Sequence, residues 1–430
     1  MKSWVVLFSI LSGLHGCNPD KIDIQRDNNG IITQLPHVWK SSRSDGGLAL
    51  GMYRGYFIGE KGLLCVATRK SADPAGEFYL QLKDVNSGEN IWIWDDFFEK
   101  KLARPLNRSI VVHENKLILH DLWADYCIDA QTGSTVWKRI RGFGSASELT
   151  NINDKYFITG LSKESKDAKK IDDAIFIGDF KSGQVEQLVK PDYSAEYPFF
   201  NGQSTYIGSI YRFKTFTKDG NDLLLIPYDE IGPEVKYNNN RSFFGLYNIS
   251  QRAWIYNRKP LSLEEDGSSP SLMPIIHDDK VFLTSLNSLG CFELPTGKRI
   301  WQYRLTEVHT SFRDMLLVDG KMVISSLDGN LYCVDAKNGT QLWASPSGAF
   351  SSDIYHQDGV LYGINGDFLR ACELKTGQVL WELKSLDGKL DGRDDSEFEG
   401  FVTGLPGANG KKGRIFATTN LNIYCFEAAR

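Results

Sequence analysis

The chain has 430 residues, of which 41% are apolar, 12% aromatic and 24% charged, and its formal net charge is −5. A mildly acidic chain lacks the basic face that a nucleic-acid partner requires, so the composition argues against such a partner. After residue 16 no stretch approaches the eighteen apolar residues of a transmembrane helix.

The N-terminus predicts export. Met1-Lys2 gives a short basic start, and residues 4–14 form an apolar stretch of eleven residues. Such a stretch is too short to span a bilayer, but it is typical of a signal peptide.

The apolar stretch ends in Leu14-His15-Gly16-Cys17, which resembles a bacterial lipobox, although His15 departs from the usual small residue. In a lipobox the cysteine becomes lipidated and N-terminal. We therefore expect residues 1–16 to be a lipoprotein signal peptide and Cys17 to carry the lipid. Residues 17–30 would form a lipidated tether, and Asn18 in place of Asp favours the outer membrane. A plain secretory signal with an incidental cysteine is the alternative.

The remaining residues, 31–430, read as one repeating β structure. Residues 31–40 form an apolar strand that ends in Trp39-Lys40 and precedes the first full repeat.

A short phrase then recurs, of which one copy reads Asp129-Ala130-Gln131-Thr132-Gly133-Ser134-Thr135-Val136-Trp137. In five copies the glycine lies four residues before the tryptophan. The Gly supplies the positive φ that a tight turn needs, and the Trp can wedge between neighbouring units. The five pairs are Gly88 and Trp92, Gly133 and Trp137, Gly297 and Trp301, Gly339 and Trp343, and Gly377 and Trp381.

Two weaker copies keep part of the pattern. Gly183 is followed four residues later by Gln187, so this copy lacks the Trp. In the other copy Trp254 is present, and Ser250 replaces the Gly. Polar turns followed by apolar strands lie upstream of most copies. Repeats of roughly 40–50 residues built from short strands and Gly turns predict a β-propeller.

The glycine turns indicate seven units, and residues 413–427 supply two further strands without a following Gly-Trp strand. We expect the strand at 31–40 to pair with these last strands, which would close the ring and remove its exposed edge. The prediction is therefore an all-β, eight-bladed propeller closed by an N-terminal strand. A seven-bladed ring with irregular insertions at 190–260 is the rival.

The repeat resembles the PQQ-type propeller repeat, whose consensus is close to G-x-L-Y-A-L-D-A-x-T-G-x-x-x-W, over roughly residues 50–430. This repeat occurs in quinoprotein alcohol dehydrogenases. It also occurs in the non-catalytic BamB-type lipoprotein, an accessory subunit of the outer-membrane β-barrel assembly machine. The resemblance implies a propeller fold and leaves both functions open.

The cysteines are expected to be free thiols. Cys127, Cys291 and Cys333 each lie six residues before a turn glycine, and Cys372 and Cys425 fall at or near the same strand position. The resembled consensus has Ala there, which points to small buried packing residues. No CxxC or paired Cys/His spacing indicates a metal site.

No catalytic constellation is found, so we expect no catalytic residue, cofactor or metal. Quinoprotein dehydrogenases carry a vicinal Cys-Cys disulfide and a calcium-binding set, and this sequence has no adjacent cysteines. The histidines are scattered. Residues 387–395 superficially suggest a calcium loop, but Leu390 occupies a ligand position of the EF-hand spacing.

The sequence therefore favours a non-catalytic, lipid-anchored envelope scaffold of the outer membrane that binds a protein, with the β-barrel assembly machine as a candidate partner. A PQQ-dependent oxidoreductase or degenerate relative is the first alternative. A surface lipoprotein that binds glycan or another envelope protein is the second. Two insertions, 161–173 and 229–241, could carry recognition or be neutral elaborations.

Overall fold

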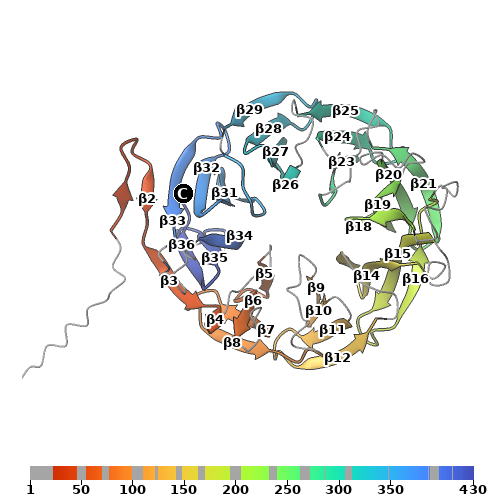
Figure 1. The fold of residues 1–430 in the computed structure, drawn as a ribbon, viewed down its shortest axis with the longest axis horizontal. Coiled ribbons are helices and arrows are strands. Elements are labelled where there is room, and N and C mark those ends of the chain that lie inside the picture. The colour runs from red at the N-terminus through yellow and green to blue at the C-terminus, as the bar shows by residue number, and fades with distance from the viewer. Residues whose placement is uncertain are drawn as a thin grey trace, which may run out of the picture.

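The strands form a closed ring around a central axis, as Figure 1 shows for the computed structural model. The structure describes residues 23–45, 55–69, 77–98, 110–121, 124–141, 148–162, 170–193, 205–231, 240–261, 272–285, 287–305, 312–346, 348–385, 387, 397–408 and 410–430. All the regular secondary structure within these ranges is β-strand. They contain no helix long and apolar enough to cross a membrane.

Three of the seven sheets are antiparallel meanders of four consecutive strands. The first contains β9 (Ile110–His113), β10 (Lys116–His120), β11 (Ala124–Asp129) and β12 (Thr135–Ile140). The second contains β22 (Ile275–His277), β23 (Lys280–Thr284), β24 (Ser288–Glu293) and β25 (Arg299–Arg304). The third contains β26 (Phe312–Val318), β27 (Lys321–Ser326), β28 (Leu331–Asp335) and β29 (Gln341–Ser345).

Two further sheets contain such a meander with additional strands. One contains β5 (Tyr56–Ile58), β6 (Gly62–Arg69), β7 (Glu77–Asp84) and β8 (Asn90–Trp94), with β4 (Ser44–Asp45) beside β6. The other contains β30 (Tyr355–Gln357), β31 (Val360–Asn365), β32 (Phe368–Glu373) and β33 (Val379–Lys384), with β2 (Ile32–Gln34) and β1 (Gln25–Arg26) outside β33.

The nine-stranded sheet contains two meanders, joined where β15 pairs in parallel with β17. The first is β13 (Leu149–Ile152), β14 (Lys155–Leu161), β15 (Lys170–Asp179) and β16 (Val185–Val189). The second is β18 (Lys214–Lys218), β19 (Asn221–Ile231), β20 (Asn240–Asn248) and β21 (Ala253–Pro260), with β17 (Thr205–Ile210) beside β19. The ends of both expected insertions are therefore strand, while 163–169 and 232–239 lie outside the described residues.

The seventh sheet closes the ring. β3 (His37–Ser42) pairs antiparallel with β36 (Asn422–Glu427), placing Trp39 opposite Cys425, and β35 (Arg414–Thr419) and β34 (Phe398–Leu405) complete the meander. The predicted closure by an N-terminal strand is confirmed. Grouping strands by meander gives eight four-stranded units, and eight apolar clusters each join two neighbouring units.

The expectation of one strand over residues 31–40 is corrected. Strand β2 ends at Gln34, and β3 begins at His37 after Leu35-Pro36. Proline has no N–H for a ladder hydrogen bond, which favours a break here. The two strands then serve different units, because β2 lies in parallel beside β33, with Ile32 opposite Trp381.

The contact between units depends on the predicted glycine and tryptophan. In five pairs of neighbouring units the glycine turn of one unit covers the tryptophan of the preceding unit. A Cβ at Gly133, for example, would lie 2.8 Å from the Trp92 ring. Gly133 also has a φ of +72°. Either feature makes a side chain unfavourable there. The same contact joins Gly88 to Trp39, Gly183 to Trp137, Gly339 to Trp301, and Gly377 to Trp343.

The indole N–H of five wedge tryptophans also donates to a backbone carbonyl of the next unit. Trp92 donates to the carbonyl of Ala130 at 3.1 Å, one residue after the acidic residue that begins the phrase. The repeat therefore positions a hydrogen-bond acceptor as well as a ring contact. Equivalent bonds run from Trp39 to Val85, from Trp137 to Phe180, from Trp301 to Ala336, and from Trp343 to Leu374, at 3.0–3.2 Å.

The wedge role expected for Trp254 is wrong. Its place in the register belongs to Tyr256, which pairs with Leu246 and donates its hydroxyl to the carbonyl of Leu294 at 3.0 Å. If Asn248 is taken as the first residue of the phrase, the glycine position falls four residues later on Arg252, which has a positive φ of 50°, and not on Ser250. The phrase therefore keeps its usual spacing, and its turn and wedge positions lie two residues later than the assignment based on Trp254. Trp254 packs on Tyr247 within its own unit.

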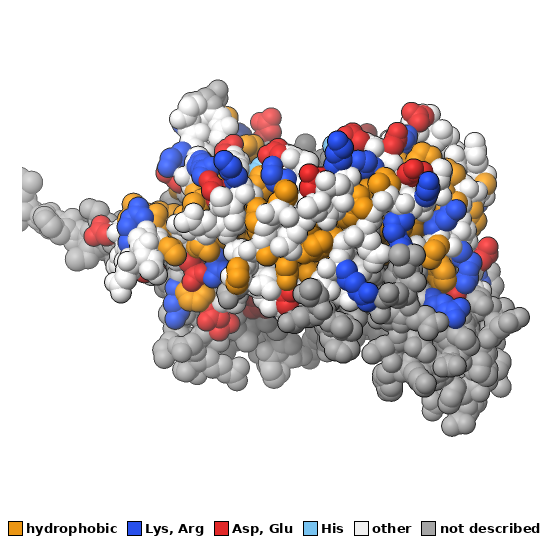
Figure 2. Space-filling model, turned by 90° about the horizontal axis from the view of Figure 1, so that it is seen from above, with side chains coloured by type: hydrophobic (Ala, Val, Ile, Leu, Met, Phe, Trp, Pro, Cys, Tyr) orange, Lys and Arg blue, Asp and Glu red, His pale blue; other side chains and the backbone are white. Residues whose placement is uncertain are grey.

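The outer wall carries apolar side chains at a regular position. The residue before five of the wedge tryptophans is exposed. Figure 2 shows hydrophobic side chains across the middle of the wall, with many charged side chains above them. This alternation follows from the two faces of a strand. The exposed residues include Val38, Ile91, Val136, Ile300 and Leu342, which are 44–48% exposed.

Replacing Trp39 by Ala should destabilise the protein about as much as replacing Trp343 by Ala. Both rings cover a turn glycine and both indoles donate to a backbone carbonyl. A buried Trp lost to Ala costs about 3–5 kcal/mol, with the half-buried Trp343 at the lower end. Urea unfolding measures both values. If Trp39→Ala left the urea midpoint unchanged while Trp343→Ala lowered it, β3 would not be part of the ring.

Candidate functional site

The wedge of Trp381 has a different cover from the others. By repeat order its cover should come from the turn between the last two strands of the next unit. Those strands are β36 and β3, which come from opposite parts of the sequence, so no glycine turn joins them. Ala428 still takes the repeat position, because its N–H donates to the carbonyl of Gly413 at 2.8 Å, as Ala130 does to Asn115.

The N-terminal segment replaces the missing turn incompletely. Ile32 and Leu35 pack against the apolar cluster that contains Trp381, and Trp381 is 3% exposed. A cavity of about 760 Å³ remains between this segment and the end of β36. We call it the seam pocket. Its lining is Ile24, Ile32, Leu35, Pro36, His37, Val38, Leu380, Trp381, Lys412, Glu427, Ala428, Ala429 and Arg430.

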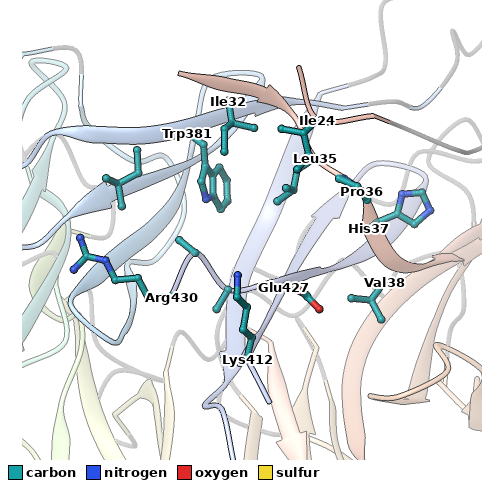
Figure 3. A pocket seen from close by; sticks show the side chains of 13 residues that line it. Ile24, Ile32, Leu35, Pro36, His37, Val38, Trp381, Lys412, Glu427 and Arg430 are labelled. Atoms are coloured by element: carbon teal, nitrogen blue, oxygen red, sulfur yellow. The ribbon is translucent and has the colours of Figure 1, made fainter. Parts of the chain in front are cut away.

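The seam pocket is mostly apolar with a few charges at its edge. Figure 3 shows Ile32 and Leu35 on one side, and Lys412 extending toward the space between Trp381 and Leu35. Arg430 is engaged elsewhere, because its guanidinium pairs with Glu373 at 2.8 Å. An apolar pocket with a few fixed polar groups is the usual form of a binding site.

The buried carboxylates in the described ranges serve structural networks. Asp125 pairs with Arg141 at 2.6 Å and with Arg139 at 2.5 Å, all beside the end of β11. Asp121 accepts hydrogen bonds from the Tyr126 hydroxyl and the Ala124 N–H, both at 2.6 Å.

Asp387, the first residue of the suspected calcium loop, is also occupied. Its carboxylate accepts hydrogen bonds from Asn422, Thr419 and Tyr424, and it pairs with Lys40 at 3.2 Å. Residues 388–395 lie outside the described residues. In the part of the chain that the structure describes, no three His, Cys, Asp or Glu side chains are grouped to hold a metal ion.

His120 is the buried histidine nearest to these networks. Burial, with Arg141 nearby, lowers the pKa of His120 to about 3. The imidazole is therefore neutral at neutral pH and a weak base. General-base catalysis favours a pKa near the working pH, so His120 suits a packing role.

Five cysteines lie where the repeat places them. Cys127, Cys291, Cys333, Cys372 and Cys425 are free and buried, as the register predicts. Cys65, which lies on β6, is also free and buried. Burial raises the pKa of each thiol, to about 11 for Cys65 and about 12 for Cys127. Because the thiolate is the reactive form, these residues are poor nucleophiles. Cys17 lies outside the described residues.

The six thiols should be unreactive in the folded protein and all should react after unfolding. The test uses the Cys17→Ser variant, so that Cys17 does not contribute to the count. In buffer at pH 8, dithionitrobenzoate should label no thiol, because burial keeps the groups protonated. In guanidinium without reductant it should label six thiols. Rapid labelling of the native protein, or fewer than six thiols after unfolding, would contradict this assignment.

One sign of the seam pocket is present in the sequence, although the count of glycine turns passes over it. Glu427-Ala428 matches the start of the phrase, like Asp129-Ala130. This match marks the unit whose turn should lie over Trp381. The lining residues from the N-terminal segment and Lys412 have no motif of their own, and only the ring closure brings them together.

Comparison with known proteins supports the resemblance. A family profile described as "Outer membrane protein assembly factor BamB" matches residues 251–430. The BamB protein of Legionella pneumophila (strain Paris) is 34% identical over 143 residues, which cover 29% of this chain and 36% of that relative. The match therefore spans about a third of the relative's length.

Two solved structures share the fold at low identity. BamB from Moraxella catarrhalis has a TM-score of 0.54 and 12% identity, over 88% of this chain and 94% of its own. The quinohemoprotein alcohol dehydrogenase from Comamonas testosteroni has a TM-score of 0.64 and 12% identity, over 92% and 77%. These likenesses establish the propeller fold. They do not choose between a scaffold and a dehydrogenase, because one fold hosts both.

Proposed function

We propose that the protein is a non-catalytic envelope scaffold that receives an apolar segment of a protein partner in the seam pocket. The seam pocket carries this proposal. It is the place in the ring where a wedge tryptophan lacks its own glycine turn, and its cover comes from a separate segment. The resemblance to BamB suggests a partner in the β-barrel assembly machine.

The chemistry of the described residues supports a binding role over a catalytic one. The buried acids have fixed partners, the thiols are protonated, and His120 is a weak base. The seam pocket instead offers apolar contact area from Ile24 and Val38, which are 57% and 44% exposed. Exposed apolar area beside a concave site is typical of a protein contact.

A binding assay tests the proposal. The soluble protein should retain the purified barrel subunit of the assembly machine on a column, and Val38→Asp should weaken retention by about tenfold or more, since a charge must then be desolvated in an apolar contact. Val136→Asp is the matched control, because Val136 holds the same strand position on another unit and is 46% exposed.

Equal losses of retention in both variants, or retention unchanged by Val38→Asp, would count against the seam pocket as the binding site.

The dehydrogenase alternative is tested with the same protein. Addition of PQQ and Ca²⁺ should give no dye reduction with alcohols or sugars. PQQ-dependent turnover would show that the protein is an enzyme and would overturn the proposed scaffold function.

We also propose attachment to the membrane through Cys17, which the lipobox-like sequence suggests. Cys17→Ser should move the protein from the membrane fraction to the soluble periplasmic fraction, because no acyl chain can then be added. Fractionation after a salt wash measures this. A Cys17→Ser protein that still sediments with membranes would show that another contact anchors it.

A further inference from the structure

Strand β7 carries a buried charge where the other units carry none. Lys83 lies immediately before Asp84, the acidic residue of the first phrase. In the other units the residue before the first residue of the phrase is apolar, aromatic or glycine. These residues are Ile128, Gly178, Tyr247, Phe292, Val334, Cys372 and Phe426.

The hydrogen bonds of the Lys83 ammonium run to neutral groups. Lys83 is 2% exposed, and its Nζ donates to the hydroxyl of Ser41 at 2.9 Å and to the side-chain oxygen of Asn90 at 2.8 Å. No carboxylate in the described ranges forms an ion pair with it. Among the described residues the ammonium therefore has no counter-charge, which is unfavourable for a buried side chain.

An open polar cavity of about 450 Å³ lies against this ammonium, between β3 and the strands β7 and β8. Besides Lys83, its lining includes Ser42, Asn90 and Glu89. The side-chain oxygen of Asn90 accepts from Lys83, so the NH₂ group of its amide can donate to another acceptor. The cavity thus offers the positive charge of Lys83 and the amide donors of Asn90.

The positive charge at this site belongs to Lys83. Lys40 also borders the cavity, but its ammonium already pairs with Asp387 at 3.2 Å. Glu89 is exposed at the edge, where water screens its charge. A single oxyanion can reach Lys83 past this edge, whereas a dense polyanion would meet repulsion from Glu89.

We propose that this cavity is an oxyanion-binding site in which Lys83 pairs with a carboxylate or phosphate group of a ligand that enters from the outer wall. The ligand supplies the counter-charge that none of the described residues provides. The inference rests on Lys83 and its surroundings alone, and it is independent of the seam pocket and of the proposed scaffold role.

A purely structural role for Lys83 makes a different prediction. Through Ser41 the ammonium also ties the closing strand β3 to β7, and Ser41 in turn donates to the carbonyl of Gly88 at 2.6 Å. If this tie were the whole role, anions would have no specific effect on Lys83. The two roles therefore separate by ligand response and not by stability.

The test follows the side-chain signals of ¹³C-lysine in the soluble Cys17→Ser protein, with the Lys83 signal assigned from Lys83→Met. Titration with inorganic phosphate or acetate should shift the Lys83 signal saturably, and the signals of exposed lysines should follow ionic strength only. Methionine fits a position that is apolar in the other units, so Lys83→Met should fold.

Calorimetry then compares variants. Lys83→Met should lose anion binding by about tenfold or more. The control Lys138→Met removes a half-buried lysine of β12 that pairs with Asp96, and it should bind as the parent does. Vesicles of phosphatidylglycerol form a separate arm. Lys83-dependent binding to vesicles alone would identify the oxyanion as a lipid headgroup.

Absence of a saturable Lys83 response to phosphate, acetate and vesicles would overturn the proposal. So would equal anion affinity in Lys83→Met and its parent. If Lys83→Met did not fold, the titration of the parent protein would still decide, with the Lys83 signal then assigned from Lys83→Arg.

Discussion

The ring depends on one repeated contact, in which the tryptophan of one unit lies against the glycine turn of the next. The contact combines three requirements. The turn needs a positive φ, as at Gly133; the Trp92 ring leaves no room for a Cβ there; and the Trp92 indole N–H needs the carbonyl of Ala130. Each requirement alone is met by many sequences. Together they fix both residue types and their spacing, and they make each unit depend on its neighbour for a complete core.

Closure of the ring follows from the same contact and creates both candidate sites. Strand β3 brings Trp39 onto Gly88, so the interface between the first and last units is built like the others. Closure by a separate strand has two consequences, one on each side of β3. On one side the Trp381 wedge loses its own turn and the seam pocket remains. On the other side the interface becomes polar around Lys83.

The sequence is sufficient to predict the propeller, the wedge positions and the free thiols, because each has a fixed spacing that local chemistry explains. It is insufficient where a spacing is ambiguous or where distant segments meet. Trp254 is assigned to the wedge position because the other wedge residues are tryptophans. The spacing of the phrase, taken from Asn248 as its first residue, places Tyr256 there instead. Pro36 divides an apolar run that has the appearance of one strand. The lining of neither pocket could be predicted, since Leu35 and Lys412, or Ser41 and Lys83, become neighbours only after the ring closes.

The central claim is that β3 is a full member of the ring and not an appended strand. Native-state hydrogen exchange of the backbone amides tests it most directly, because the free energy of opening reports how each strand is tied to the rest. We predict that the hydrogen-bonded amides of β3 exchange as slowly as those of β29, which is the outermost strand of a unit built from four consecutive strands. Exchange of β3 that is much faster than that of β29, with β34 to β36 still protected, would contradict it.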